Sequence, residues 1–145
     1  MDDGLLNRVR GTVRTVPDFP IEGIMFRDIT PVLGEPGLVS SITDRFAEDL
    51  KKLGWAPDSV VGPEARGFIF GPLLADRLGC GFIPVRKPGK LPSVTRSVEY
   101  SLEYGTNALE IHEDAIKPGH KVVIIDDLLA TGGTISACTS LCEEL

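Results

Sequence analysis

Hydrophobic residues recur along the chain with two different periods. Spacings of three and four positions mark amphipathic helices, whereas short unbroken apolar runs are typical of strands buried on both faces of a parallel sheet. The helical segments are residues 4–14, 38–53 and 66–78 and a last one from about Gly133, and the strand segments are residues 59–62, 81–86 and 121–126. Because strands alternate with helices, the pattern predicts an α/β fold with a mostly parallel, twisted sheet, right-handed crossovers and flanking helices.

Two stretches depart from this alternation. Residues 17–36 contain four prolines and predict an irregular segment with a short extended piece near residues 24–26. Residues 87–97 are rich in Lys, Pro, Gly and Ser and predict a mobile loop. Apolar and polar residues then alternate over residues 98–104, which predicts one arm of a hairpin with residues 108–112 as its partner.

Composition and charge narrow the class of protein. The 145 residues suffice for one domain, and 42% hydrophobic with 25% charged residues is ordinary for a globular chain. A net charge of −6 argues against a general nucleic-acid or membrane surface, although residues 77–98 hold five cations and no acidic residue. No apolar run approaches the ~18 residues of a membrane span. Three cysteines are too few for a disulfide scaffold, so we expect a reduced, cytoplasmic protein.

The strongest chemical signal lies at residues 122–134, where four apolar β-formers run into Asp126 and Asp127. Open α/β sheets bind ligands at the carboxyl ends of their strands, which is where these carboxylates fall. The following small residues, Ala130-Thr131-Gly132-Gly133-Thr134, can wrap a phosphate with backbone N–H groups at a helix N-terminus. Together they predict a ribose-phosphate site, with the carboxylates on the 2′ and 3′ hydroxyls or on a hydrated Mg²⁺.

Other readings of this segment are weaker. A Walker B strand also ends in two carboxylates, but it needs an upstream Gly-x-x-x-x-Gly-Lys-Ser/Thr loop. The only Gly-Lys pair is Gly89-Lys90, with Leu91 after it and Pro84 at the first glycine position. The Gly-x-Gly-x-x-Gly fingerprint of dinucleotide-binding folds is absent as well. An ordinary buried strand followed by a turn and a helix remains as the plain alternative.

Charged residues also follow two other strands. Glu64-Ala65-Arg66 comes directly after the strand at 59–62, and a guanidinium beside a helix N-terminus can hold pyrophosphate oxygens. A surface arginine at a helix start fits the residues equally well. Arg86, Lys87 and Lys90 leave the next strand and can neutralise charge on a leaving group, or simply form a solvated basic loop.

Two further segments are ambiguous on their residues alone. Glu103 beside Tyr104 can move a proton at a heterocyclic base while the aromatic ring closes over it, but an exposed glutamate at a strand end fits as well. The pair Arg27-Asp28, flanked by Phe26 and Ile29, reads as structural.

Taken together, six segments resemble the adenine phosphoribosyltransferases, a family of type I phosphoribosyltransferases. The matching segments are Pro-Asp-Phe-Pro (17–20), Phe-Arg-Asp-Ile-Thr-Pro (26–31), Ala-Arg-Gly-Phe-Ile-Phe-Gly (65–71), Arg-Lys-Pro-Gly-Lys-Leu-Pro (86–92), Tyr-Ser-Leu-Glu-Tyr-Gly (100–105) and the segment at 122–134. The resemblance implies a type I phosphoribosyltransferase fold in one domain, residues 1–145, with an N-terminal helix and hood (1–36), a core (37–145) and a mobile hairpin loop. It also implies transfer of a phosphoribosyl group from phosphoribosyl pyrophosphate to adenine, giving AMP and pyrophosphate, by a cytoplasmic, Mg²⁺-dependent homodimer of purine salvage.

The resemblance implies a role for each matching residue. The 5′-phosphate falls to Ala130, Thr131, Gly132, Gly133 and Thr134, and the ribose hydroxyls to Asp126 and Asp127, directly or through hydrated metal. Pyrophosphate falls to Arg66 and the loop before it, assisted by Arg86, Lys87 and Lys90 from the same chain or across a dimer interface. Adenine falls to Met25, Arg27 and Leu128, with Glu103 as acid/base at N7 and Tyr104 on the same loop.

The carboxyl end departs from the family pattern. The chain stops inside or at the end of its last helix, whereas family members continue for a few tens of residues, so we expect a shortened form without its edge strand or strands. A weakly active or inactive variant that binds nucleotide, or pairs with full-length subunits, is therefore the alternative to an active enzyme. A DNA-binding sensor on this fold needs an added helix-turn-helix, for which the residues before position 17 are too few. We therefore expect neither a nucleic-acid nor a membrane partner.

Overall fold

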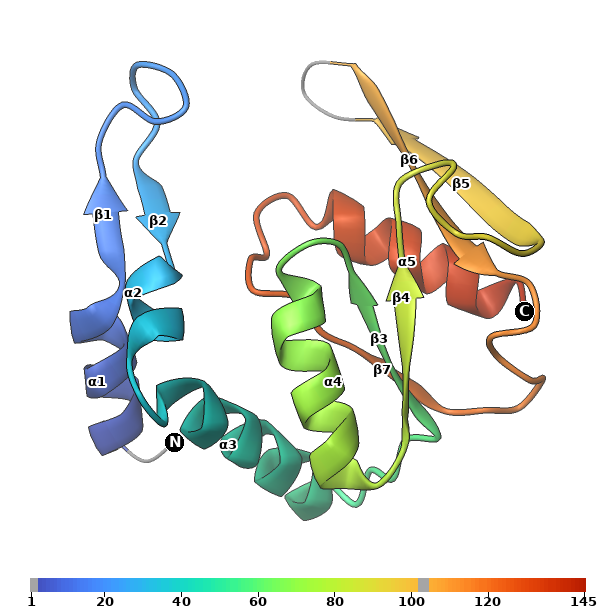
Figure 1. The fold of residues 1–145 in the computed structure, drawn as a ribbon, viewed down its shortest axis with the longest axis horizontal. Coiled ribbons are helices and arrows are strands. Elements are labelled where there is room, and N and C mark those ends of the chain that lie inside the picture. The colour runs from blue at the N-terminus through green and yellow to red at the C-terminus, as the bar shows by residue number, and fades with distance from the viewer. Residues whose placement is uncertain (1–2, 102–104) are drawn as a thin grey trace. The chain divides into compact units, whose positions relative to one another are not determined.

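The computed structural model describes residues 3–101 and 105–145. The chain divides into two compact units, Met1–Phe46 and Ala47–Leu145, and helix α3 (Leu38–Lys52) runs across the division (Figure 1). The division therefore falls within a helix.

The first unit contains more regular structure than its prolines predicted. Its elements before α3 are α1 (Asp3–Thr12), β1 (Arg14–Val16), β2 (Phe26–Asp28) and α2 (Thr30–Gly34). Strands β1 and β2 pair antiparallel, with Arg14 opposite Asp28 and Val16 opposite Phe26. The predicted extended piece near residues 24–26 thus overlaps β2 at Phe26, whereas the prediction of irregular structure was wrong for the rest of β2 and for α2. Three-residue strands are too short to show a period, and their partner lies about ten residues away in the sequence.

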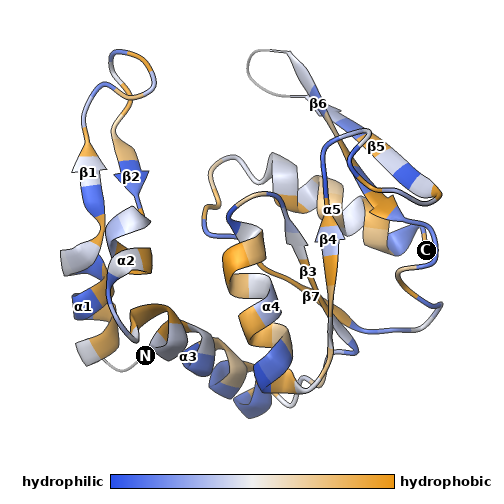
Figure 2. Cartoon of the chain, in the orientation of Figure 1, coloured by the Kyte–Doolittle hydropathy of each residue, from blue (hydrophilic) through white to orange (hydrophobic). Residues whose placement is uncertain are grey.

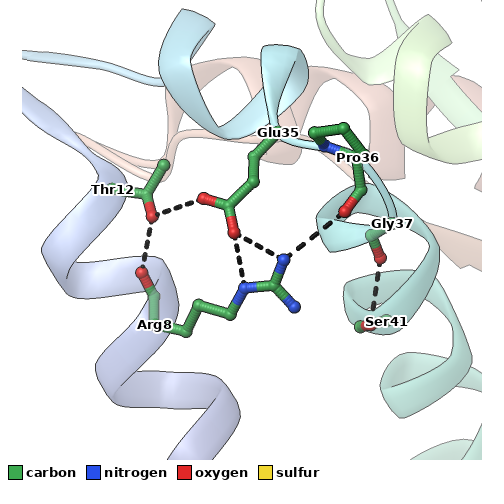
Figure 3. Close-up of polar contacts among 6 residues, drawn as sticks. All are labelled: Arg8, Thr12, Glu35, Pro36, Gly37 and Ser41. Atoms are coloured by element: carbon green, nitrogen blue, oxygen red, sulfur yellow. Dashed lines mark hydrogen bonds and ion pairs between the residues drawn. The ribbon is translucent and has the colours of Figure 1, made fainter.

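A polar cluster ties α1 to the segment after α2 (Figure 3). Arg8 Nε donates to Glu35 Oε1 at 2.6 Å, and the Thr12 hydroxyl donates to Glu35 Oε2 at 3.1 Å. Arg8 Nη2 also donates to the Pro36 carbonyl at 3.4 Å. The Arg8 and Thr12 hydrogen bonds hold the pKa of Glu35 below its usual value, so this carboxylate stays ionised at neutral pH.

The second unit carries the parallel sheet that the sequence predicted. Its elements after α3 are β3 (Ser59–Pro63), α4 (Gly67–Leu78), β4 (Gly81–Val85), β5 (Thr95–Ser101), β6 (Thr106–His112), β7 (Val122–Ile124) and α5 (Gly133–Glu143). The strand order is β4-β3-β7, all parallel, with Val61 opposite both Ile83 and Ile124. Strand β7 is shorter than predicted, but the Ile125 N–H still donates to the Val61 carbonyl at 2.9 Å. The chain therefore stays in line with the sheet up to the two aspartates.

Alternate residues of the strands meet different helices. Val61 and Ile83 belong to a buried cluster with Ala137, Cys138 and Leu141 of α5. Phe82 points to the opposite face, because successive side chains of a strand alternate. Its ring lies where side-chain carbons on Gly62 and on Gly71 of α4 would be. Helices thus cover both faces, and Figure 2 shows that much of α4 and β4 is hydrophobic.

A hairpin lies beside the sheet. Strands β5 and β6 pair antiparallel from Thr95 opposite His112 to Ser101 opposite Thr106, so the predicted arms are confirmed over residues 98–101 and 108–112. Residues 102–104, which connect them, lie outside the described residues. Glu110 of β6 and Arg86, the residue after β4, exchange two backbone hydrogen bonds, which connect the hairpin to the edge of the parallel sheet.

Within the described part of the chain, none of the helices combines the length and the apolar character needed to cross a membrane.

Candidate active site

A cavity of about 470 Å³ opens at the carboxyl ends of β3 and β7 in the second unit. Its walls come from the segments that follow these strands, from Lys87 after β4, and from Tyr100 and Leu109 of the hairpin. The lining residues of the two post-strand segments are Glu64, Ala65 and Arg66 and all ten residues from Asp126 to Ile135. The volume suits a small organic ligand, and the position is the one at which α/β sheets bind ligands.

The two aspartates at this edge have different surroundings. The Asp127 side chain is only 6% exposed and forms an ion pair with Arg66 Nε at 2.9 Å. The Asp127 N–H donates to Asp126 Oδ1 at 2.9 Å. Burial raises the pKa of Asp126 to about 6, and the neighbouring Asp127 carboxylate adds to this, while the Asp127 N–H and Arg66 oppose it. The structure thus brings together three predicted site residues, and one of them changes charge near pH 6.

The predicted phosphate loop, residues 130–134, leads directly into α5. Gly132 is the residue before the helix and has φ of 85°, a left-handed conformation that favours glycine. The Ser136 N–H donates to the Gly132 carbonyl at 2.9 Å and so closes the first helical turn. The first N–H groups of an α-helix have no partner within the helix and carry its positive dipole end. All five loop residues line the cavity, so this end of α5 is available to an anion there.

Tyr100 is a lining residue that the sequence did not single out. Its ring packs beside Gly133, where a side-chain carbon would lie 3.5 Å from Cδ2, and its hydroxyl is 3.5 Å from the Thr134 hydroxyl. The alternation along this strand marked Tyr100 only as an apolar-face residue. No signal in the sequence related it to the phosphate loop, which lies more than thirty residues later.

The predicted cations cluster around an acidic residue, Glu64. Lys90 Nζ lies 2.9 Å from Glu64 Oε2, Arg86 Nε lies 3.3 Å from Oε1, and the Lys87 N–H donates to Oε1 at 2.8 Å. Burial alone would raise the pKa of Glu64, but hydrogen bonds from Lys90 and from the Lys87 N–H outweigh it and hold that pKa below its usual value. The Arg86 guanidinium also lies 5.7 Å over the Phe68 ring. Of the three cations, Lys87 lines the described part of the cavity. Arg86 and Lys90 instead form ion pairs with Glu64, which is itself a lining residue.

Of the residues predicted to bind adenine or to move a proton, only one is a lining residue of the cavity among those that the structure describes. Leu128 lines the cavity and is half exposed. Met25 and Arg27 belong to the first unit, where Met25 is exposed and Arg27 donates to the Thr15 hydroxyl. Glu103 and Tyr104 lie outside the described residues. The adenine-binding and acid/base roles of these residues therefore stay predictions.

The donor set at the aspartates suits a hydrated cation rather than a fully protein-ligated one. Among residues 3–101 and 105–145, no three His, Cys, Asp or Glu side chains gather into a metal cluster. Mg²⁺ keeps several waters and is commonly held by one or two carboxylates together with substrate phosphates. Asp126 and Asp127 fit that arrangement, with Asp127 held in place by Arg66.

Comparison with known proteins identifies the family. Residues 33–145 match the model of the phosphoribosyl transferase domain family. The chain is 53% identical over 139 residues to the adenine phosphoribosyltransferase of Francisella tularensis subsp. novicida, which covers 96% of this chain and 79% of that protein.

Solved structures give the same relationship in three dimensions. The crystal structure of adenine phosphoribosyltransferase from Thermoanaerobacter pseudethanolicus is 54% identical, with a TM-score of 0.92 over 97% of this chain and 80% of that one. The Saccharomyces cerevisiae enzyme, complexed with an imino-altritol bisphosphate and adenine, is 42% identical, with a TM-score of 0.94 over 98% and 82% of the two chains. The chain therefore belongs to the phosphoribosyltransferase family and, within it, to the adenine phosphoribosyltransferases.

Proposed function

We propose that this chain transfers the phosphoribosyl group from phosphoribosyl pyrophosphate to adenine, forming AMP and pyrophosphate. One observation carries the proposal: a single cavity joins a phosphate loop at a helix N-terminus, two strand-end aspartates and a cationic wall. These are the three kinds of group that a 5-phosphorylated ribose with a pyrophosphate leaving group requires. The printed names of its relatives, and the adenine bound to the yeast enzyme, support the choice of base.

The phosphate loop and the aspartates fix the sugar. Backbone N–H groups of residues 131–134 receive the 5′-phosphate, and the Thr131 and Thr134 hydroxyls add hydrogen bonds. Asp126 and Asp127 accept from the 2′ and 3′ hydroxyls. Holding the sugar at both ends orients its anomeric carbon, which lowers the entropic part of the barrier.

The cations act on the leaving group. The glycosidic carbon gains positive charge as its bond to pyrophosphate lengthens, and negative charge accumulates on the pyrophosphate. Arg66 and Lys87 line the wall where this charge forms, with Arg86 and Lys90 behind them. Such preorganised positive groups stabilise a developing anion. Adenine, held by Met25, Arg27 and Leu128, attacks from the other face, with Glu103 moving a proton at N7 and Tyr104 helping to exclude water.

The proposal includes Mg²⁺, held through water by Asp126 and Asp127. When bound, the ion neutralises charge on the pyrophosphate oxygens. We further propose that the protein is a cytoplasmic homodimer of purine salvage, which the family resemblance supports. The buried Cys138 thiol, whose pKa burial raises to about 12, agrees with a chain that keeps its cysteines reduced.

An assay with tritiated adenine tests the proposal. With phosphoribosyl pyrophosphate and MgCl₂ we expect labelled AMP, and we expect EDTA to abolish its formation. The Asp126→Asn/Asp127→Asn double variant serves as the inactive control, and thermal unfolding establishes that each protein is folded. No AMP from a folded wild-type protein would contradict the proposal. Calorimetric binding of AMP without turnover would instead support the nucleotide-binding alternative.

A further inference from the structure

Glu64 is a third anion in the wall of the cavity, beside Asp126 and Asp127. It follows β3 directly, lines the cavity and has a side chain that is only 11% exposed. The reaction described above gives its side chain no role. Its contacts nevertheless involve every member of the cationic turn, by which we mean Arg86, Lys87 and Lys90.

Glu64 engages the donors that a phosphate group would use. Its two oxygens face the Lys90 ammonium at 2.9 Å and the Lys87 N–H at 2.8 Å. Arg86 Nε is also close, at 3.3 Å, but it is buried and makes no hydrogen bond within the described residues. Of these three donors, Glu64 therefore hydrogen-bonds two and leaves Arg86 Nε without a hydrogen bond.

Pyrophosphate that binds at this turn competes with Glu64 for hydrogen-bond donors and is repelled by its charge. It needs the same ammonium and N–H groups, so hydrogen bonds to Glu64 must be shared or broken. It also brings several negative charges close to a carboxylate that is largely removed from water, where like charges repel most strongly. The low pKa of Glu64 means that the carboxylate does not escape this repulsion by taking up a proton at neutral pH.

We infer that Glu64 is a built-in counter-anion, a positioning residue that holds the cationic turn in place and lowers its affinity for pyrophosphate. The inference rests on the proposed function, in which pyrophosphate is the product that must leave. When the Glu64 carboxylate forms its hydrogen bonds with Lys90 and the Lys87 N–H again, it favours the dissociation of pyrophosphate. It also keeps the turn ordered between turnovers, when no ligand neutralises its charge.

The chain provides a matched control in Glu110. This β6 residue also supports the turn, accepting from the Gly89 N–H at 3.2 Å, but it does not line the cavity. Glu64→Gln and Glu110→Gln remove the same charge and preserve shape. Only the first removes it from the cavity wall, beside the side chains of Arg86 and Lys90.

Isothermal titration with sodium pyrophosphate in a MgCl₂ buffer tests the inference. We expect Glu64→Gln to bind pyrophosphate about tenfold more tightly than wild type, because a like-charge contact is removed. Glu110→Gln should bind it as wild type does. Ribose 5-phosphate, which uses the phosphate loop, should bind all three proteins with affinities within about twofold of one another.

Tighter binding cannot arise from misfolding, which makes the expected result specific. Equal or weaker pyrophosphate binding by Glu64→Gln would overturn the inference and leave Glu64 as a structural support of the turn. An equal gain in Glu110→Gln would overturn it too, since the effect would then come from overall charge. The AMP assay can be negative whatever the titrations show, and the reverse also holds. A result that contradicts the proposed function is therefore distinguishable from one that contradicts this inference.

Discussion

At the scale of single residues, Asp126 makes the site sensitive to pH. Its pKa of about 6 in the folded protein lies above the ordinary value of 3.8, so folding favours the protonated carboxyl. The stability it contributes is fully present below pH 4 and is lost as the pH rises through 6. At pH 7.5 the ionised group destabilises the fold by about 1 kcal/mol, after discounting for the solvent that screens a half-buried carboxyl.

Asp126→Asn should therefore raise the free energy of unfolding at pH 7.5 and leave it unchanged near pH 4, because Asn is neutral at both. The same substitution should weaken ribose 5-phosphate binding. Urea unfolding at the two pH values measures the first effect, and calorimetry the second. A variant less stable than wild type at pH 7.5 would show that the aspartate is stabilising as an anion.

Residues differ in how visible their roles are in the sequence. Asp126 and Asp127 could be predicted because an apolar strand marks the place where a parallel sheet ends. The contacts of Glu64 could not, since its partner Lys90 lies 26 residues away and its hydrogen bonds depend on how β3 and β4 pair.

At the scale of elements, the packing of α4 on the sheet requires glycine at position 71, where a side chain would collide with Phe82. A Cβ on Gly71 would lie 2.2 Å from Phe82 Cε2, and one on Gly62 would lie 2.9 Å from the same atom. The Phe82 ring is also in edge contact with Phe68, at 5.7 Å between centroids. The ring is therefore confined on several sides and cannot move aside cheaply.

Gly71→Ala should lower the free energy of unfolding by roughly 1–3 kcal/mol, because overpacking outweighs the better helix propensity of alanine. Gly81→Ala is the control: it adds the same methyl group where nothing lies within 4 Å. Chemical denaturation of both variants gives the comparison. If Gly71→Ala were as stable as Gly81→Ala, the close approach of α4 and β4 would be incorrect.

Long elements were easier to predict than short ones. Helix α3 and strands β3 and β4 have enough residues to show a clear period or an unbroken apolar run, and their predicted bounds agree with the structure within one or two residues. Strands β1 and β2 have three residues each and depend on each other for hydrogen bonds. Their pairing is a tertiary interaction, and a local pattern cannot contain it.

At the scale of the whole molecule, the unit that holds the cavity also holds the parallel sheet β4-β3-β7. Every lining residue of the cavity falls between Glu64 and Ile135, within the second unit. The predicted base-binding residues Met25 and Arg27 belong to the first unit. The proposed sugar-phosphate site therefore lies within one unit.

Binding of ribose 5-phosphate to the isotopically labelled protein, followed through amide chemical shifts, tests the central claim most directly. We predict that the largest shifts fall on the amides of residues 126–134, as the sugar meets the aspartates and its phosphate meets the start of α5. Shifts confined to other surfaces, with these amides unmoved at saturating ligand, would contradict the assignment of this cavity as the phosphoribosyl site.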